Sequence, residues 1–215
     1  MIARIFTFNI ILCCLFISPQ YSTSQVTDLS YTLSPMGEYI LWGDQAGLKD
    51  GFTVGGKLGF GFGQFVELSG TYLQALNLQT DFSDYGIPGY SESLFTARDV
   101  NWQRYGGELR FNLSKGALLP FLTVGSGIQR TELTVPQSSN ILNEQIYIDL
   151  GAGVVLSIAD RYTLSLALRN NQYRFNAVRD LMTTSDRDVL GIISENYSTE
   201  KVVNWGLNAL SLIHI

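Results

Sequence analysis

Hydrophobic and polar residues alternate along most of the chain that follows Gln25. In the clearest segment, 52–62, one face carries Phe52, Val54, Gly56, Leu58, Phe60 and Phe62, and the other carries Thr53, Gly55, Lys57, Gly59 and Gly61. A period of two predicts a β-strand, because successive side chains of a strand point to opposite faces. Residues 145–158 repeat this pattern over a span well above the roughly 5 to 6 residues of an ordinary strand.

Eight segments show the alternation and are predicted to be strands: 37–42, 52–62, 65–78, 100–113, 119–131, 145–158, 162–175 and 202–209. Their connections alternate in length, with 63–64, 114–118 and 159–161 short and 43–51, 79–99, 132–144 and 176–201 long. An antiparallel meander gathers every second connection at one end, and this asymmetry is typical of outer-membrane barrels. We therefore predict an all-β fold, an eight-stranded antiparallel up-and-down transmembrane barrel with short periplasmic turns and long extracellular loops.

The make-up of the two faces indicates which one meets lipid. A soluble barrel would alternate in the same way with inside and outside exchanged. The polar face is small, which suits a narrow lumen: Thr53, Gly55, Gly59, Gly61, Ser69, Thr71, Thr123, Gly125, Gly127, Gly151, Gly153, Thr163 and Ser165. The other face is bulky and uncharged and is predicted to contact lipid: Leu58, Phe60, Val66, Leu68, Leu109, Phe111, Leu122, Val124, Leu164, Leu166 and Leu168.

Aromatic residues fall near the ends of the predicted strands. Tyr39, Tyr72, Trp102, Tyr105 and Trp205 lie towards the long loops, and Phe62, Phe111 and Tyr162 lie towards the short turns. Two such groups predict girdles at the two membrane interfaces. Scattered aromatics in any β protein would give a similar distribution, so this alternative stays open at this point.

Two strands also carry a family resemblance. Residues 52–62 have the sequence Phe-Thr-Val-Gly-Gly-Lys-Leu-Gly-Phe-Gly-Phe, and residues 119–127 have Leu-Pro-Phe-Leu-Thr-Val-Gly-Ser-Gly. With the strand count, they make residues 35–209 resemble the eight-stranded outer-membrane barrels typified by OmpA and OmpX, of the porin family. The resemblance implies the fold and names no activity. A Gln25 start after a Ser-x-Ser cleavage site is similar to barrels of Bacteroidetes type.

Eight charged residues share the predicted lumen face: Glu38, Lys57, Glu67, Arg104, Glu108, Arg110, Asp149 and Arg169. The four positive and four negative charges can neutralise one another, as a low-dielectric interior requires. The interior of an eight-stranded barrel is about wide enough for side chains alone. We therefore expect a plugged, salt-bridged lumen; a charged constriction of a solute or ion channel is the alternative.

Composition excludes several classes of function. Among 215 residues, 15% are charged and 21 are glycine, against about 25% charged in an ordinary soluble domain. A net charge of -5 leaves no basic surface for nucleic acid. The single histidine, His214, lies at the end of the chain, which leaves few schemes of acid–base catalysis near neutral pH.

The first 24 residues are predicted to be a cleaved secretory signal peptide. One positive charge precedes an apolar run over 5–17, and Ser22 and Ser24 supply the small residues of a cleavage site. Both cysteines, Cys13 and Cys14, leave with it, so the exported chain has no disulfide or thiolate site. We expect a periplasmic lead-in over 25–34 and a barrel over 35–215 in the outer membrane, in contact with its lipid and lipopolysaccharide.

No catalytic, cofactor-binding or metal-binding residues are expected, so the chain is predicted not to be an enzyme. Lipid A acyltransferases and deacylases share the barrel architecture. A resemblance of this chain to them would require a histidine with a serine near the catalytic end, and the chain has no histidine before His214. The loop pairs Asp81 with Asp84 and Asp186 with Asp188 have a spacing that could hold Ca²⁺. Solvated loop carboxylates are the commoner explanation.

Loops 79–99 and 176–201 are long and rich in apolar residues, which favours a folded cap or a partner-binding surface over disorder. Residues 178–182 are predicted to form a short helix. Adhesion through these loops and a purely structural envelope role are both left open, as expectations from the fold.

The last predicted strand changes pattern at Leu210, where the apolar positions move to the inward face. A bulge would explain this inversion. A non-native tail over 210–215 is the other explanation, and then His214 would be an artefact. A peptidoglycan-binding domain could follow in that case.

Overall fold

The computed structural model describes residues 29–82, 98–114, 118–134, 141–159, 162–190 and 199–214. The strands are β1 Leu29–Leu41, β2 Gly51–Phe62, β3 Val66–Ala75, β4 Leu78–Gln79, β5 Asp99–Asn112, β6 Leu118–Leu133, β7 Ile141–Ala159, β8 Tyr162–Phe175 and β9 Glu200–His214. Within these residues three short helices accompany the strands: η1 Asp44–Ala46, α2 Ala177–Leu181 and α3 Thr184–Leu190. In the described part of the chain no helix is long and apolar enough to cross a membrane.

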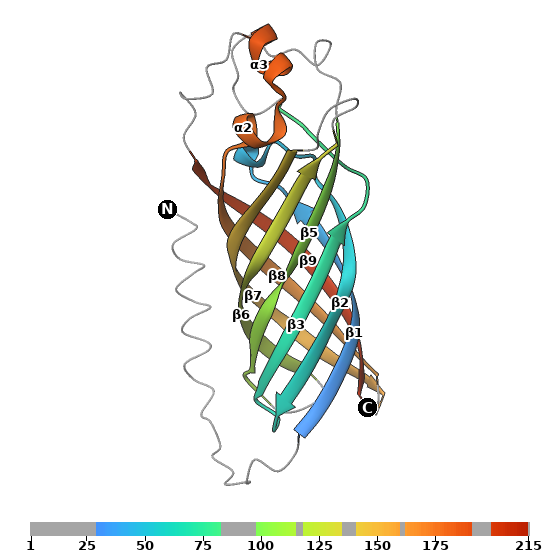
Figure 1. Cartoon of the computed structure of the whole chain (residues 1–215). Helices are drawn as coiled ribbons and strands as arrows, with labels where there is room; N and C mark the ends of the chain where they lie inside the picture. Colours follow the sequence, from blue (N-terminus) through green and yellow to red (C-terminus); the bar gives the residue numbers. More distant parts are fainter. Residues whose placement is uncertain are drawn as a thin grey trace, which may run out of the picture.

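The strands close into an antiparallel barrel. β1 pairs with β2 on one side and with β9 on the other, and the remaining neighbours are consecutive in the chain except that β3 also pairs with β5. β4 continues β3 after a break at Asn77, whose φ of 53° interrupts the extended backbone, and both pieces pair with β5. The nine named strands therefore occupy eight positions, as the sequence predicted. Figure 1 shows α2 and α3 at one end of the barrel and the β2–β3 turn at the other.

The first strand begins earlier than predicted. β1 starts at Leu29. Residues 29–34, which were assigned to the lead-in over 25–34, and residues 35–36, which precede the first predicted strand, therefore belong to the barrel wall. Here Thr32 and Ser34 point inwards while Tyr31 and Leu33 point outwards. The residues alternate over 29–34, but the pattern fails at Pro35, which lacks a backbone N–H, and at Met36, an apolar residue at an inward position, so the strand was predicted to begin only after this interruption. The predicted signal peptide, 1–24, lies outside the described residues.

The strands also extend further into the long-loop end than the alternation indicated. β6 ends at Leu133 and β7 begins at Ile141. The predicted loop over 132–144 therefore shortens to 134–140. The two strands remain paired from Leu118 with Leu156 up to Leu133 with Ile141, because backbone hydrogen bonds continue where side chains no longer alternate.

The inversion at Leu210 involves no bulge. Cα partners between β8 and β9 keep one register from Phe175 with Glu200 to Tyr162 with Ile213. Leu210 occupies an inward position in strict alternation and is only 5% exposed, while Ser211 is exposed. Leu210 pairs with Met36 of β1, which is also buried, so two apolar side chains share this part of the interior with the buried Ser165 of β8.

Candidate functional site

All eight predicted lumen charges point into the barrel and are buried. They come from β1, β2, β3, β5, β7 and β8, which are six of the eight strand positions in the wall. Each is at most 6% exposed. Positions of one parity on antiparallel strands meet inside, which is why residues distant in the sequence form a single cluster.

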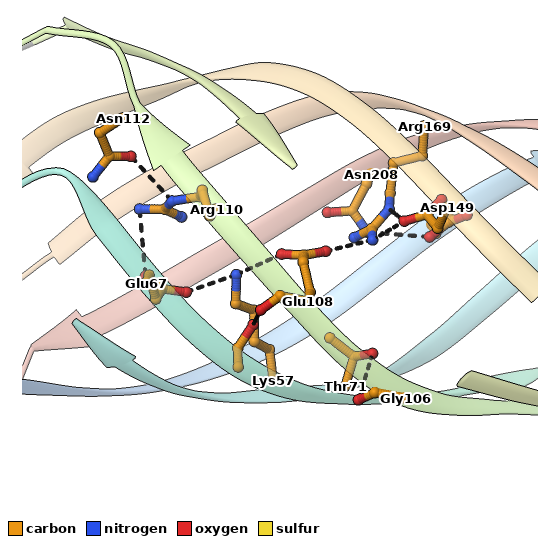
Figure 2. A network of polar contacts seen from close by, with 12 residues as sticks. Lys57, Glu67, Thr71, Gly106, Glu108, Arg110, Asn112, Asp149, Arg169 and Asn208 are labelled. Atoms are coloured by element: carbon orange, nitrogen blue, oxygen red, sulfur yellow. Dashed lines mark hydrogen bonds and ion pairs between the residues drawn. The ribbon is translucent and has the colours of Figure 1, made fainter. Parts of the chain in front are cut away.

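Six of these residues form a continuous chain of ion pairs, which we call the lumen ion chain: Arg110, Glu67, Lys57, Glu108, Arg169 and Asp149. Nζ of Lys57 lies 2.7 Å from Oε1 of Glu67 and 2.8 Å from Oε1 of Glu108. Nη2 of Arg110 lies 3.5 Å from Oε2 of Glu67. Figure 2 shows the chain running across the interior from Arg110 to Asp149.

Arg169 forms the far end of the lumen ion chain. Its Nε donates to Oδ2 of Asp149 at 2.8 Å, and its Nη2 contacts both Asp149 and Glu108. Positive and negative groups alternate from one end of the chain to the other. Each buried charge is therefore compensated by a direct neighbour, which offsets the cost of removing it from water.

The remaining pair, Arg104 and Glu38, lies on the same inward face. Nη2 of Arg104 is 2.8 Å from Oε2 of Glu38, which also accepts a hydrogen bond from Asn208 at 3.4 Å. The guanidinium lies 5.6 Å from the ring centroid of Trp102 and 5.4 Å from that of Tyr147. These cation–π contacts connect the charged zone to the aromatic residues next to it.

Glycine makes room for the charged side chains at close approaches. A Cβ at Gly206 would lie 2.3 Å from Oε1 of Glu38, and a Cβ at Gly59 would lie 2.9 Å from Oε1 of Glu67. Real Cβ atoms do not approach oxygen so closely, so any other residue would displace the carboxylate. Gly59 and Gly206 therefore leave room for two carboxylates of the lumen, whereas a Cβ at Gly55 or Gly153 would instead meet a backbone carbonyl oxygen.

An apolar cluster closes the loop end of the lumen, and we call it the loop-end cap. Helix α2 contributes buried side chains to it, and Asn176 caps this helix by accepting a hydrogen bond from the N–H of Arg179 at 3.0 Å. Gly47, at a φ of 62°, lies so close to Phe82 that a Cβ would be 2.9 Å from its ring. The cap consists of Trp42, Ala46, Leu48, Phe82, Trp102, Ala177, Val178, Leu181 and Met182.

The structure corrects the position of Trp102. It was predicted to lie in the outer aromatic girdle but is 0% exposed inside the barrel, with its ring centroid 5.4 Å from that of Trp42 in an edge-to-face arrangement. The physical reason is parity. Trp102 is two residues from Arg104, and strand residues two apart share a face, so an inward Arg104 requires an inward Trp102.

The other predicted girdle residues with described side chains lie on the outer wall. Trp205, Tyr72 and Tyr105 are exposed at the loop end, and Tyr39 packs on the exposed Phe52 with centroids 4.7 Å apart. Phe62 and Phe111 are exposed near the turn end. Tyr162 begins β8, but its side chain lies outside the described residues.

A smaller apolar cluster lies in the lumen towards the turn end. Phe121, Val155 and Ala167 are buried together. The guanidinium of Arg110, the first group of the lumen ion chain, lies 5.0 Å from the ring centroid of Phe121. The lumen ion chain therefore ends next to this cluster, and the charged residues lie between it and the loop-end cap.

The predicted helix over 178–182 corresponds to α2, one residue earlier in the chain. Its apolar side chains face the barrel mouth and are buried, so they form a folded cap. The alternation of strand residues cannot reveal such a cap, because its residues come from loops.

The candidate Ca²⁺ sites receive no support from the described residues. No three His, Cys, Asp or Glu side chains are placed there to hold a metal ion. Asp84 and the side chain of Asp186 lie outside the described part of the chain, so their pairings with Asp81 and Asp188 are not seen.

Comparison with known proteins identifies the fold. No protein-family model matches, and no curated protein matches. The crystal structure of Neisserial surface protein A is similar over 86% of this chain and 98% of that one, with a TM-score of 0.58 and 13% identity. The chain has the fold of an outer-membrane β-barrel. At this identity the similarity establishes the architecture alone, and it gives the Bacteroidetes-type lineage no support.

Two further structures resemble this barrel at lower TM-scores. The N-terminal β-barrel domain of Pseudomonas aeruginosa OprF has a TM-score of 0.45 and 12% identity, over 85% of this chain and 97% of that chain. Ail of Yersinia pestis, in complex with the heparin analogue sucrose octasulfate, has a TM-score of 0.44 and 12% identity, over 86% and 97%.

Proposed function

We propose that this outer-membrane barrel is a closed structural protein of the cell envelope, exported by a cleaved signal peptide over 1–24. The observation that supports a closed lumen is the lumen ion chain, which spans the interior between two apolar clusters. A conducting pore needs a continuous aqueous path. Here Glu108 forms ion pairs with both Lys57 and Arg169, and these pairs lie where that path would run.

A solute or ion channel fits this arrangement of charges less well than a closed barrel does. A selective constriction presents charge of one sign to a passing ion, whereas the lumen charges are paired and balanced. An aqueous path would also have to pass Trp42, Trp102 and the helix α2, all of which are in the loop-end cap. A lipid-modifying enzyme stays a weaker alternative, without a catalytic group assigned to it.

Partner binding or adhesion through the loops is a second proposal. The burial of Val178 and Leu181 in the cap means that these side chains are not available to a partner. Such binding would instead use α3 and the remainder of loops 79–99 and 176–201. Residues 83–97 and 191–198 lie outside the described residues. Peptidoglycan binding stays tied to a further domain after the barrel.

Planar-bilayer recording tests the closed lumen. The purified barrel, inserted at one copy per bilayer, is expected to give no large and steady single-channel current. A paired variant, Lys57→Ser with Glu108→Ser, removes the centre of the ion chain and keeps the lumen neutral. It is expected to show brief currents that the parent protein lacks. Large, steady currents from the parent protein would refute the proposal.

A further inference from the structure

A groove on the outer wall lies beneath helix α2 at the loop end of the barrel. It has a volume of about 720 Å³ and is formed by the ends of β7, β8 and β9 together with α2. The residues that matter for its chemistry are Ile146, Ile148, Gln172, Arg174, Arg179 and Lys201. The apolar members belong to the wall that faces lipid, and the basic members lie on the side of the loops.

The apolar part of the groove is unusually open. Ile146 is 75% exposed and Ile148 is 56% exposed. Both point outwards from β7, on the same face as Leu150, which continues the lipid-facing band towards the turn end. A hydrocarbon chain lying against the barrel would cover these side chains.

The basic part of the groove lies at the height of a lipid headgroup. Trp205 marks the membrane interface on β9, and Lys201 precedes it by four residues towards the loop end, which is about 13 Å along a strand. Arg174 pairs with Lys201 across β8 and β9. Both side chains are exposed on the outer wall, on the loop side of Trp205.

The charges in the groove favour an anion. Arg179 donates to Oδ1 of Asp180 at 2.8 Å, a contact that raises the pKa of Arg179. Within the described part of the chain, neither Arg174 nor Lys201 forms an ion pair. Glu144 is the other acid at the groove. Arg174 and Lys201 are thus two neighbouring cations with hydrogen-bond donors directed to the solvent or headgroup region.

We propose that this groove binds an outer-leaflet lipid with a phosphorylated headgroup. Arg174 and Lys201 hold the phosphate, and Ile146 and Ile148 contact an acyl chain. Phosphate is the anion that fits two adjacent basic donors, and the apolar side chains next to them on β7 select a lipid over a soluble phosphate. The site is separate from the lumen, so it does not depend on whether the lumen is closed.

Lipid retention by the intact barrel tests the site. The protein is reconstituted in phosphatidylcholine nanodiscs containing a minor fraction of diphosphorylated lipid A, extracted in mild detergent, and examined by native mass spectrometry. The double variant Arg174→Gln with Lys201→Gln is expected to retain about 25-fold less lipid A, since each cation near a membrane surface contributes about fivefold. Both positions are exposed, and circular dichroism verifies that the variant folds.

Two controls identify the source of the binding. Arg130→Gln removes a partly exposed cation of β6 that neighbours Glu144 across the strands but does not line the groove, and it is expected to leave retention unchanged. Inorganic phosphate, added at the concentration of lipid A, is expected not to displace the lipid. Unchanged retention by the double variant would overturn the proposal. An equal loss with Arg130→Gln, or displacement by inorganic phosphate, would also overturn it.

Discussion

Glu108 joins the two halves of the lumen ion chain, so replacing it tests whether the chain stabilises the barrel. Its carboxylate accepts from Nζ of Lys57 at 2.8 Å and contacts Arg169, and it is 3% exposed. Glu108→Gln keeps the size of the side chain and removes the charge. Loss of one partner from a buried ion pair costs about 3 to 5 kcal/mol. We expect the lower end of this range, because Lys57 retains Glu67 and Arg169 retains Asp149.

The matched control is Glu132→Gln at the rim of the barrel. Its partner Arg130 lies 3.7 Å away, and the two side chains are 24% and 40% exposed. An exposed pair of this kind contributes about 0 to 1 kcal/mol. The same chemical change is therefore expected to cost several times more inside the lumen than at the rim.

Reversible urea unfolding in phosphatidylcholine vesicles, followed by tryptophan fluorescence, measures both free energies of unfolding. A double variant, Glu108→Gln with Arg169→Gln, restores equal numbers of positive and negative lumen charges. It is expected to lose less than the sum of the two single changes, by about 0.5 to 3 kcal/mol. If Glu108→Gln costs no more than Glu132→Gln, or if the double variant is additive, the lumen ion chain does not stabilise the barrel.

Two further predictions concern the lumen glycines and the loop-end cap. Gly206→Ala is expected to destabilise the barrel by about 1 to 3 kcal/mol, because the new Cβ would lie 2.3 Å from Oε1 of Glu38. Gly37→Ala is the control, since nothing lies within 4 Å of a Cβ at that position. Equal melting temperatures for the two variants would contradict this explanation. Trp102→Ala is expected to cost about 3 to 5 kcal/mol in urea unfolding, because its side chain is fully buried. Trp205→Ala, at an exposed wall position, should cost less than half as much, and the opposite order would place Trp102 in the girdle after all.

The lumen residues could be predicted from the sequence because a strand has a fixed period. Once Thr53 and Lys57 define the inward parity of one strand, the antiparallel partners follow, and the charges of each strand can be assigned to a face. Trp102 shows what happens when this rule, that strand residues two apart share a face, is not applied. Its parity matched that of Arg104, but its aromatic character was given more weight than its position, and the prediction was wrong for that reason.

The loop-end cap could not be predicted in the same way. Phe82, Val178 and Leu181 lie in connections, where no period relates one residue to the next. Their apolar character indicated a cap or a partner surface without distinguishing them. The distinction depends on tertiary packing, such as the close approach of Gly47 to Phe82 and Ala177, and a single sequence does not contain that information.

Charge balance connects the low charge content to the closed lumen. Each lumen charge has a compensating neighbour, and a single neutral substitution upsets the balance of four positive and four negative charges, whereas removing one positive and one negative group together preserves it. Arg169 is the clearest case, since it contacts both Glu108 and Asp149. An interior built in this way resists opening, because at least one buried ion pair must separate before water can enter and solvate the two charges. The exposed cations of the outer wall, Arg174 and Lys201, are not held in buried ion pairs. They are therefore available to a ligand, whereas the charges of the lumen are not.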